Sequence, residues 1–145
     1  MDIAILGDTS RSMKKIHREK LVQLVNDLID ELGVSPEGSH YGFITFDRYA
    51  KLIIHFSEPA YHNKEVLRKE IEQKIMDEPK EWGTRTDLAF NLADTQLFTQ
   101  KEGDRPDAKN VMLVFTDGKP KISSRDKKPV IPFSKSTKSL EVSQS

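Results

Sequence analysis

A carboxylate and two hydroxyls stand at alternate positions near the start of the chain. They are Asp8, Ser10 and Ser12 in "ILGDTSRSMKK", where they follow an apolar run and precede a long amphipathic stretch. A serine in front of a helix is usually an N-cap, so each hydroxyl taken singly is most simply explained by capping. Their alternation with a carboxylate also suits another role, which is to hold a cation through oxygen atoms.

Two later segments carry side-chain oxygens of the same kind. "GTRTD" contributes Thr84 and Thr86, and "TDG" contributes Asp117. Thr86 could be a helix cap and "TDG" is a common turn sequence, so neither segment is specific alone. Together with the first segment they form a set of oxygen ligands without imidazole or thiolate. Such a set favours Mg²⁺ or Mn²⁺, permits Ca²⁺ and disfavours zinc or copper.

Three stretches have the apolar spacing of amphipathic helices, at 16–32, 63–77 and 87–100. Gly33 is placed to end the first of them. The second helix is expected to turn Val66, Leu67, Ile71 and Ile75 inward. The third is expected to carry Leu88, Ala89, Leu92, Ala93 and Leu97 on one side.

Strands are predicted between and around these helices. The runs 3–6 and 111–115 are continuously apolar, as in strands buried on both faces. "HYGFITF" and "KLIIHF" are rich in aromatic and β-branched residues, and the short "DRYA" between them predicts an antiparallel pair. This order predicts an α/β fold with a Rossmann-like, mostly parallel sheet, helices on both faces and one antiparallel edge hairpin. The oxygen-bearing segments would then meet at the carboxyl ends of the strands.

The composition narrows the class of protein. With 145 residues the chain fits one domain, and its 23 basic and 23 acidic residues cancel. The net charge therefore does not indicate a nucleic-acid partner or an anionic membrane surface. No apolar run reaches the ~20 residues of a membrane helix, and the first residues predict a strand rather than a signal peptide. Because cysteine is absent, there is no disulfide framework and no thiolate zinc site.

The segments "DTSRS", "GTRTDLAFNLA" and "VMLVFTDGKP" together resemble the three signature segments of the von Willebrand factor type A domain. They match its metal-ion-dependent adhesion site, which is written Asp-x-Ser-x-Ser, then Thr, then Asp. The resemblance extends from residue 2 to about 140, so we expect one such domain over 1–140 and a tail over 141–145. The residues of these motifs are most similar to those of type A domains in extracellular-matrix and adhesion proteins.

The resemblance implies a metal site made by five residues: Asp8, Ser10, Ser12, Thr84 and Asp117. The three hydroxyls would coordinate the ion, and the two carboxylates would hold it directly or through bound waters. Mg²⁺ is the implied ion, with Mn²⁺ or Ca²⁺ as alternatives. The remaining position would take an acidic side chain from a partner protein, such as a matrix protein. Thr86 would then cap the following helix.

The implied function is a non-enzymatic, metal-dependent binding module that acts outside the cell as part of a longer protein. Two other functions stay open. One is an intracellular type A domain that serves as an assembly scaffold. The other is a Mg²⁺-dependent phosphatase with Asp8 as its nucleophile, although such enzymes generally carry a second Asp where this chain has Ser10.

The sequence departs from the family pattern in two places. After Gly118 it is rich in Ser, Lys and Pro, and "FSKSTKSLEV" offers only a weak helical face. The last strands of the family fold are therefore expected to be missing, which would leave 111–115 as an exposed apolar edge open to self-association. Arg11 stands where the family often has glycine and adds a cation beside the ion. Trp82 could contact a partner at the rim of the site, but loop packing is the favoured role.

Overall fold

A five-stranded sheet forms the centre of the fold, in the order β3-β2-β1-β4-β5. The computed structural model describes residues 1–99, 105–116 and 138–143. The strands are β1 (Asp2–Asp8), β2 (His40–Phe46), β3 (Ala50–Ile54), β4 (Asn110–Thr116) and β5 (Lys138–Ser143). β1 runs parallel to β2 and β4, β4 runs parallel to β5, and β2 pairs with β3 in the antiparallel sense. The predicted mostly parallel sheet with one antiparallel edge hairpin is confirmed.

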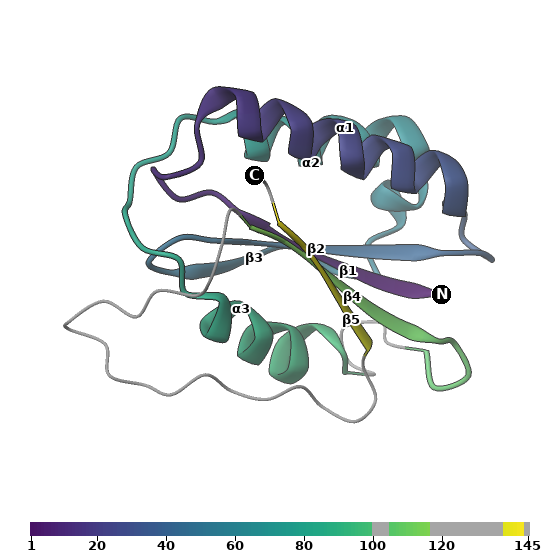
Figure 1. Cartoon of the computed structure of the whole chain (residues 1–145). Helices are drawn as coiled ribbons and strands as arrows, with labels where there is room; N and C mark the ends of the chain where they lie inside the picture. The colour runs from purple at the N-terminus through teal and green to yellow at the C-terminus, as the bar shows by residue number, and fades with distance from the viewer. Residues whose placement is uncertain (100–104, 117–137, 144–145) are drawn as a thin grey trace.

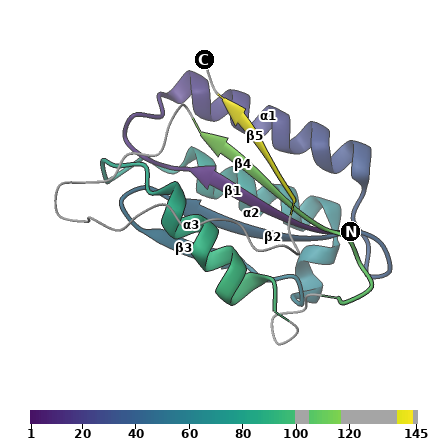
Figure 2. The ribbon, with the colours of Figure 1, turned by 60° about the horizontal axis from the view of Figure 1, so that its bottom comes forward.

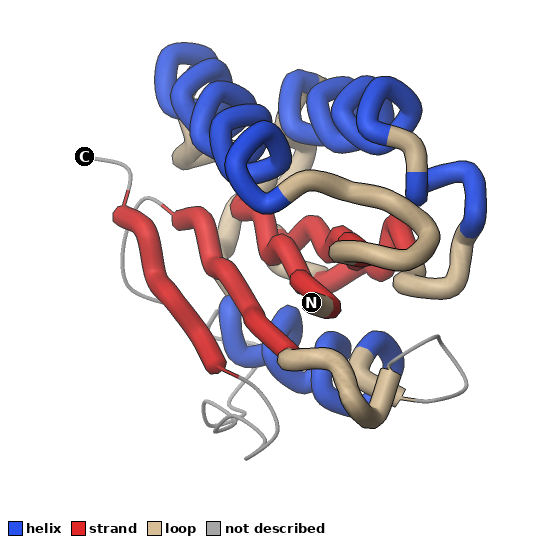
Figure 3. Tube along the Cα trace, turned by 90° about the vertical axis from the view of Figure 1, so that its right-hand side faces the viewer, coloured by secondary structure: helices blue, strands red, loops and turns tan. Residues whose placement is uncertain are grey.

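Helices cover both faces of this sheet, as Figures 1 and 3 show. They are α1 (Lys15–Leu32), the short 3₁₀ helix η1 (Pro59–His62), α2 (Lys64–Met76), α3 (Thr86–Leu92) and the π-helical turn η2 (Ala93–Leu97). α1 and α2 lie on one face, and α3 lies on the other. No helix in the described ranges is long and apolar enough to cross a membrane.

Every residue of β1 is buried, because successive side chains enter the cores on opposite faces of the sheet. Ile3 and Ile5 pack in the core under α1 and α2, whereas Ala4 and Leu6 pack in the core that contains α3 residues. A strand buried on both faces has no polar side, which is why this part of the sequence is continuously apolar.

The first predicted helix agrees closely with α1. Leu21, Val25 and Ile29 are buried along one stripe. Gly33 follows the helix with a positive φ of 73°, and its N–H donates to the carbonyl of Ile29 at 2.8 Å. Glycine adopts this backbone conformation without the steric cost of a Cβ, so the helix ends where the sequence predicted.

Two details of the other predicted helices are wrong. Leu67, Ile71 and Ile75 are buried, but the side chain of Val66 is 44% exposed. The buried residues follow one another at a spacing of four, so the inner stripe of α2 is too narrow to include the residue before Leu67. The third helix does not run on from 87 to 100, because α3 gives way to η2 after Leu92.

The region after β4 differs most from expectation. The weak helical face of "FSKSTKSLEV" is not confirmed: residues 133–137 lie outside the described residues, and Lys138–Ser143 is the strand β5. β5 runs parallel to β4 and lies beside it (Figure 2). In this register Leu140 is opposite Leu113. The prediction that β4 forms an exposed apolar edge is therefore wrong. Self-association was expected through that edge, so this reason for it no longer holds. The strand pattern was there in "SLEVS", where apolar and polar residues alternate.

Candidate metal centre

The carboxylate of Asp8 lies fully buried at the carboxyl end of β1. Its Oδ1 accepts a hydrogen bond from the backbone N–H of Ser10 at 2.8 Å. Its Oδ2 accepts one from the hydroxyl of Thr116, at the end of β4, at 3.0 Å. The carboxylate thus ties the loop after β1 to the end of the neighbouring parallel strand, which is the edge where the sequence placed the site.

The hydroxyls of Ser10 and Ser12 are hydrogen-bonded to each other, with their Oγ atoms 2.8 Å apart. Neither serine caps the following helix, because the N-cap of α1 is Lys14, which forms no side-chain capping bond. An octahedral Mg²⁺ site has metal–oxygen bonds of about 2.0–2.1 Å, which places neighbouring ligand oxygens about 2.9 Å apart. The two hydroxyls therefore have a separation that suits adjacent ligands of one ion.

The segment that carries Thr84 is anchored on two sides. The carbonyl of Glu81 accepts a hydrogen bond from the N–H of Arg11 at 2.9 Å, and the N–H of Arg85 donates to the carbonyl of Asp47 at 2.8 Å. Thr84 lies between these anchors and is 2% exposed. Backbone hydrogen bonds thus connect its segment both to the loop of the two serines and to the end of β2.

Gly83 permits the sharp change of direction in front of Thr84. Its φ is 105°, a conformation that residues with a Cβ rarely adopt. A Cβ at this position would also lie 3.4 Å from the Cα of Arg48, in the turn between β2 and β3. The position of Thr84 therefore depends on a glycine here.

The predicted capping role of Thr86 is wrong. α3 begins at Thr86 itself, and its N-cap is Arg85, without a side-chain capping bond. The hydroxyl of Thr86 is buried and has no hydrogen-bond partner within the described part of the chain. A buried hydroxyl normally finds a hydrogen-bond partner, so that of Thr86 is an exception among the described residues.

A buried ion pair that the sequence analysis missed supports the same segment. Arg85 donates from Nε and from one terminal nitrogen to the two oxygens of Asp87, at 2.8 and 2.7 Å, and both side chains are fully buried. Burial raises the pKa of Asp87, but the hydrogen bonds and charge of Arg85 outweigh it, so this pKa lies below its usual value. Residues two positions apart do not normally face each other on a helix, so the sequence spacing of Arg85 and Asp87 did not indicate that they would pair.

The fifth predicted ligand, Asp117, lies outside the described residues; it follows Thr116 directly in the sequence. Within the described ranges, no group of three or more His, Cys, Asp or Glu side chains could hold a metal ion. Three of the five predicted ligands are hydroxyls, those of Ser10, Ser12 and Thr84. Asp8 ends β1, Ser10 and Ser12 lie in the loop that follows it, and the Thr84 segment is hydrogen-bonded to that loop.

The von Willebrand factor type A domain model matches residues 2–140. The chain belongs to this family. Human matrilin-1 is 32% identical over 128 residues, which cover 86% of this chain and 25% of that protein. Human matrilin-4 is 33% identical over 123 residues, which cover 82% of this chain and 19% of that protein. The domain thus spans a quarter or less of the length of these relatives.

Solved structures show the same fold. Proximal thread matrix protein 1 from the mussel byssus superposes with a TM-score of 0.74 at 24% identity, over 85% of this chain and 32% of that one. Manganese-loaded TRAP protein of Plasmodium vivax superposes with a TM-score of 0.71 at 19% identity, over 83% of this chain and 47% of that one. Another structure of the byssus protein has a zinc-occupied MIDAS motif.

The rim of the candidate centre in this type A domain carries an exposed aromatic side chain. Trp82 is 62% exposed, and the guanidinium carbon of Arg11 lies 5.2 Å from its ring centroid. The favoured loop-packing role of Trp82 is therefore wrong, because most of the side chain faces solvent and its ring is in contact with the guanidinium of Arg11. Arg11 itself is exposed.

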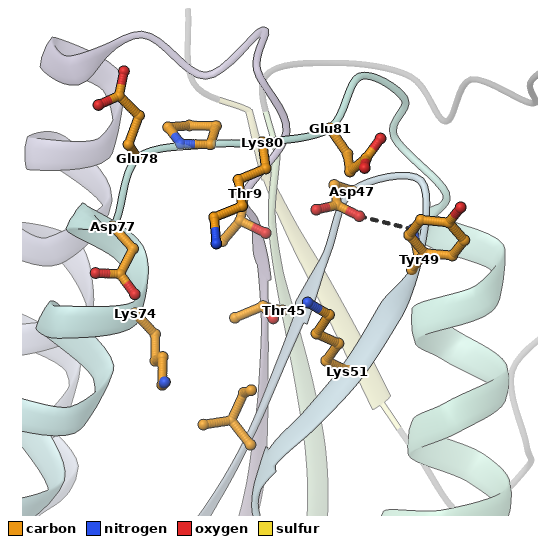
Figure 4. Close-up of a pocket in the computed structure, with 12 residues that line it drawn as sticks. Thr9, Thr45, Asp47, Tyr49, Lys51, Lys74, Asp77, Glu78, Lys80 and Glu81 are labelled. Atoms are coloured by element: carbon orange, nitrogen blue, oxygen red, sulfur yellow. Dashed lines mark hydrogen bonds between the residues drawn. The ribbon is translucent and has the colours of Figure 1, made fainter.

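A polar cavity of about 400 Å³ adjoins the loop at Thr9 (Figure 4). It lies between the ends of β2 and β3 and the loop that follows α2. Its lining residues are Thr9, Thr45, Asp47, Tyr49, Lys51, Ile53, Lys74, Asp77, Glu78, Pro79, Lys80 and Glu81. The cavity contains none of the predicted metal ligands, so it is a separate feature beside the candidate centre.

Proposed function

We propose that this domain is a non-enzymatic, metal-dependent protein-binding module of the adhesion or matrix type. A divalent cation is held by the predicted ligands Asp8, Ser10, Ser12, Thr84 and Asp117. A carboxylate of a partner protein completes the coordination. When bound, the ion supplies the positive charge that attracts this carboxylate, because hydroxyl ligands are neutral and leave most of that charge uncompensated.

The proposal is carried mainly by the 2.8 Å pair of hydroxyls at Ser10 and Ser12. Capping was the competing explanation for these serines, and the N-cap of α1 lies at Lys14 instead. The carboxylate of Asp8 is pinned by two hydrogen bonds behind them. Oxygen donors of this kind fit Mg²⁺ or Mn²⁺ best and also accept Ca²⁺.

The relatives support a partner in the extracellular matrix. The matrilins and the byssus thread matrix protein are similar to this chain. We infer that the domain acts outside the cell within a longer protein, where it binds a matrix protein through an acidic side chain. The zinc-occupied and manganese-loaded neighbours support a divalent ion in general.

Ser10 argues against phosphatase chemistry at Asp8. An enzyme that uses this carboxylate as its nucleophile generally carries a second Asp two residues further on. This chain has Ser10 at that position.

Thermal unfolding in EDTA and in millimolar Mg²⁺ or Mn²⁺ tests the metal site directly. A ligand present at 100 times its Kd stabilises the native state by about 2.7 kcal/mol, which is an upward shift of several degrees in Tm for a domain of this size. We expect this shift in the parent and its loss in Ser12→Ala and Asp117→Ala. Ser57→Ala is the matched control, since Ser57 is an exposed serine outside the site.

A Tm that is the same in EDTA and in Mn²⁺ would mean that the hydroxyls hold no ion, and the proposal would fail. It would also fail if Ser12→Ala and Ser57→Ala gained equally from the metal. The binding half of the proposal is tested with purified matrix proteins on a surface, where EDTA should abolish capture of the domain. Capture that persists unchanged in EDTA would contradict metal-dependent adhesion.

A further inference from the structure

Arg11 stands between the two predicted serine ligands in the sequence. No salt bridge to Arg11 occurs within the residues that the structure describes. Its guanidinium instead lies over the exposed ring of Trp82, 5.2 Å from the centroid. Trp82 belongs to the loop that leads to Thr84, and the N–H of Arg11 donates to the carbonyl of Glu81 in that loop. The cation is thus held by an aromatic face between two segments of the candidate metal centre.

A second pair of the same kind lies in the turn that packs on Gly83. The guanidinium carbon of Arg48 lies 5.6 Å from the ring centroid of Tyr49, which is 50% exposed. Gly83, next to Trp82, packs so closely on this turn that a Cβ would lie 3.4 Å from the Cα of Arg48. Arg48 also forms no salt bridge to any described residue. Together Arg11, Trp82, Arg48 and Tyr49 form what we call the arginine rim.

The arginine rim has the chemistry of an anion-binding contact surface. A guanidinium is planar and always charged, and its donors match the two oxygens of a carboxylate. Stacking on an aromatic ring holds the guanidinium and its donors in place, so less side-chain conformational freedom is lost when a ligand binds. Trp, Tyr and Arg are also the residue types most enriched among the energetically dominant contacts of protein interfaces.

The neighbouring acids do not neutralise this surface. Asp47 and Glu81 are close in sequence to the two pairs and line the adjoining cavity, as Tyr49 does (Figure 4). Among the described residues, neither acid forms a salt bridge with Arg11 or Arg48. The Oδ1 of Asp47 accepts a hydrogen bond from the N–H of Tyr49 at 2.8 Å, so it serves the turn. Within the described part of the chain, neither guanidinium is neutralised by an acid, so both can face an external anion beside the candidate metal centre.

We propose that the arginine rim is a second anchor next to the metal site and binds a further carboxylate in an acidic segment of the partner protein. This inference rests on the proposed function, because it places the second carboxylate beside the one that the metal takes. It adds a requirement on the partner, which must present at least two acidic side chains close together rather than one. Arg11, where the family often has glycine, then gives this domain its own partner preference.

The probe for the test is a short fluorescein-labelled peptide in which Glu alternates with Gly, with a matched peptide that carries Gln in place of Glu. Binding to the whole chain is followed by fluorescence anisotropy in millimolar Mn²⁺ and in EDTA. Trp82 is the sole tryptophan of the chain, so the emission of the unlabelled complex reports on the rim itself. We expect the Glu peptide alone to bind and to shift this emission.

The variants Arg11→Gln and Trp82→Ala should each weaken binding of the Glu peptide by about tenfold, in the range of strong interface contacts. Arg11→Lys keeps the charge but loses the planar set of guanidinium donors, so its affinity should lie between those of Arg11→Gln and the parent. Lys20→Gln is the charge-matched control on the exposed face of α1 and should bind like the parent. The Mn²⁺-dependent rise in Tm of Arg11→Gln should be at least as large as in the parent, because a cation near the ion is removed.

The outcomes separate the two proposals. If Ser12→Ala abolishes peptide binding while Arg11→Gln and Trp82→Ala bind like the parent, the second anchor is ruled out and the metal-dependent function stands. If binding is equal in Mn²⁺ and EDTA but is lost in Arg11→Gln, the anchor stands and the metal-dependent function fails. Equal binding of the Glu and Gln peptides, or no binding of the Glu peptide in millimolar Mn²⁺, overturns the anchor.

Discussion

The hydroxyl of Thr116 donates a 3.0 Å hydrogen bond to Oδ2 of Asp8 and so joins the ends of β4 and β1, although the residues are 108 positions apart in the chain. The other carboxylate oxygen is held by the N–H of Ser10. Asp8 therefore positions the serine loop relative to the sheet. This arrangement makes the site sensitive to residues that are not themselves predicted ligands.

Replacing Thr116 by valine should destabilise the domain and weaken its metal response. The change keeps the shape of the side chain but removes a hydrogen bond to a buried carboxylate, which is worth about 1.5–3 kcal/mol. Urea unfolding with and without Mn²⁺ measures both effects. Thr9→Val is the control, since its hydroxyl makes only a long 3.3 Å bond to the carbonyl of Phe46. Equal stability of the two variants would contradict this account of Asp8.

Breaking the buried pair at Arg85 should be strongly destabilising. Arg85→Met leaves the buried carboxylate of Asp87 without its main partner, a change that costs about 3–5 kcal/mol. The double variant Arg85→Met/Asp87→Leu removes both charges and should recover much of that loss. Lys64→Met, in the half-exposed pair with Asp30, should have a much smaller effect. Denaturant midpoints decide the point, and similar losses at Arg85 and Lys64 would refute it.

Gly83→Ala should disturb the metal response through the backbone of Thr84. A residue with a Cβ at a φ of 105° is strained by about 1–3 kcal/mol. Relief of this strain would move Thr84, so Mn²⁺ should raise the Tm of the variant less than that of the parent. Gly33→Ala provides the comparison, because its φ of 73° imposes similar strain at the end of α1, with no atom within 4 Å of the new Cβ. It should lower Tm while leaving the Mn²⁺ increment intact.

Stability should fall in mild acid because of His40. The ring of His40 is 8% exposed and stacks on His62, with 3.9 Å between the centroids. Burial lowers the pKa of His40 from 6.5, and the charges of His62 and Arg105 add to this, although the Pro36 carbonyl and Asp2 oppose it. The unfolded chain therefore takes up the proton first as pH falls below about 6.5, and unfolding becomes easier until the lower native pKa is passed.

Denaturant midpoints measured across this pH range check the prediction. In the parent the unfolding free energy should be highest above the unfolded pKa and should decline below it. His40→Gln cannot take up the proton, so its profile should be flatter. Parallel profiles for parent and variant would mean that another group controls the acid sensitivity.

The sequence by itself determined the parts of the fold that depend on short-range patterns. The apolar run of β1, the apolar stripe of α1 and the glycine after it are local features, so their periodicity was enough to place them. The same holds for the oxygen-bearing motif, because the alternation of Asp8, Ser10 and Ser12 is a property of one loop. Parallel strands end at one edge of a sheet, which made the meeting of the β1 and β4 ends predictable.

Only the tertiary structure decided which of these groups would find partners. Lys138–Ser143 is a strand because β4 presents unpaired backbone groups beside it, which outweighs the weak local pattern. Arg85 and Asp87 form a buried pair because the surrounding segments enclose them, not because of their spacing. Trp82 stays exposed because the loop before Gly83 turns it toward Arg11. Such contacts join residues that are brought together only by folding. A local sequence pattern therefore does not indicate which residues will surround a given side chain.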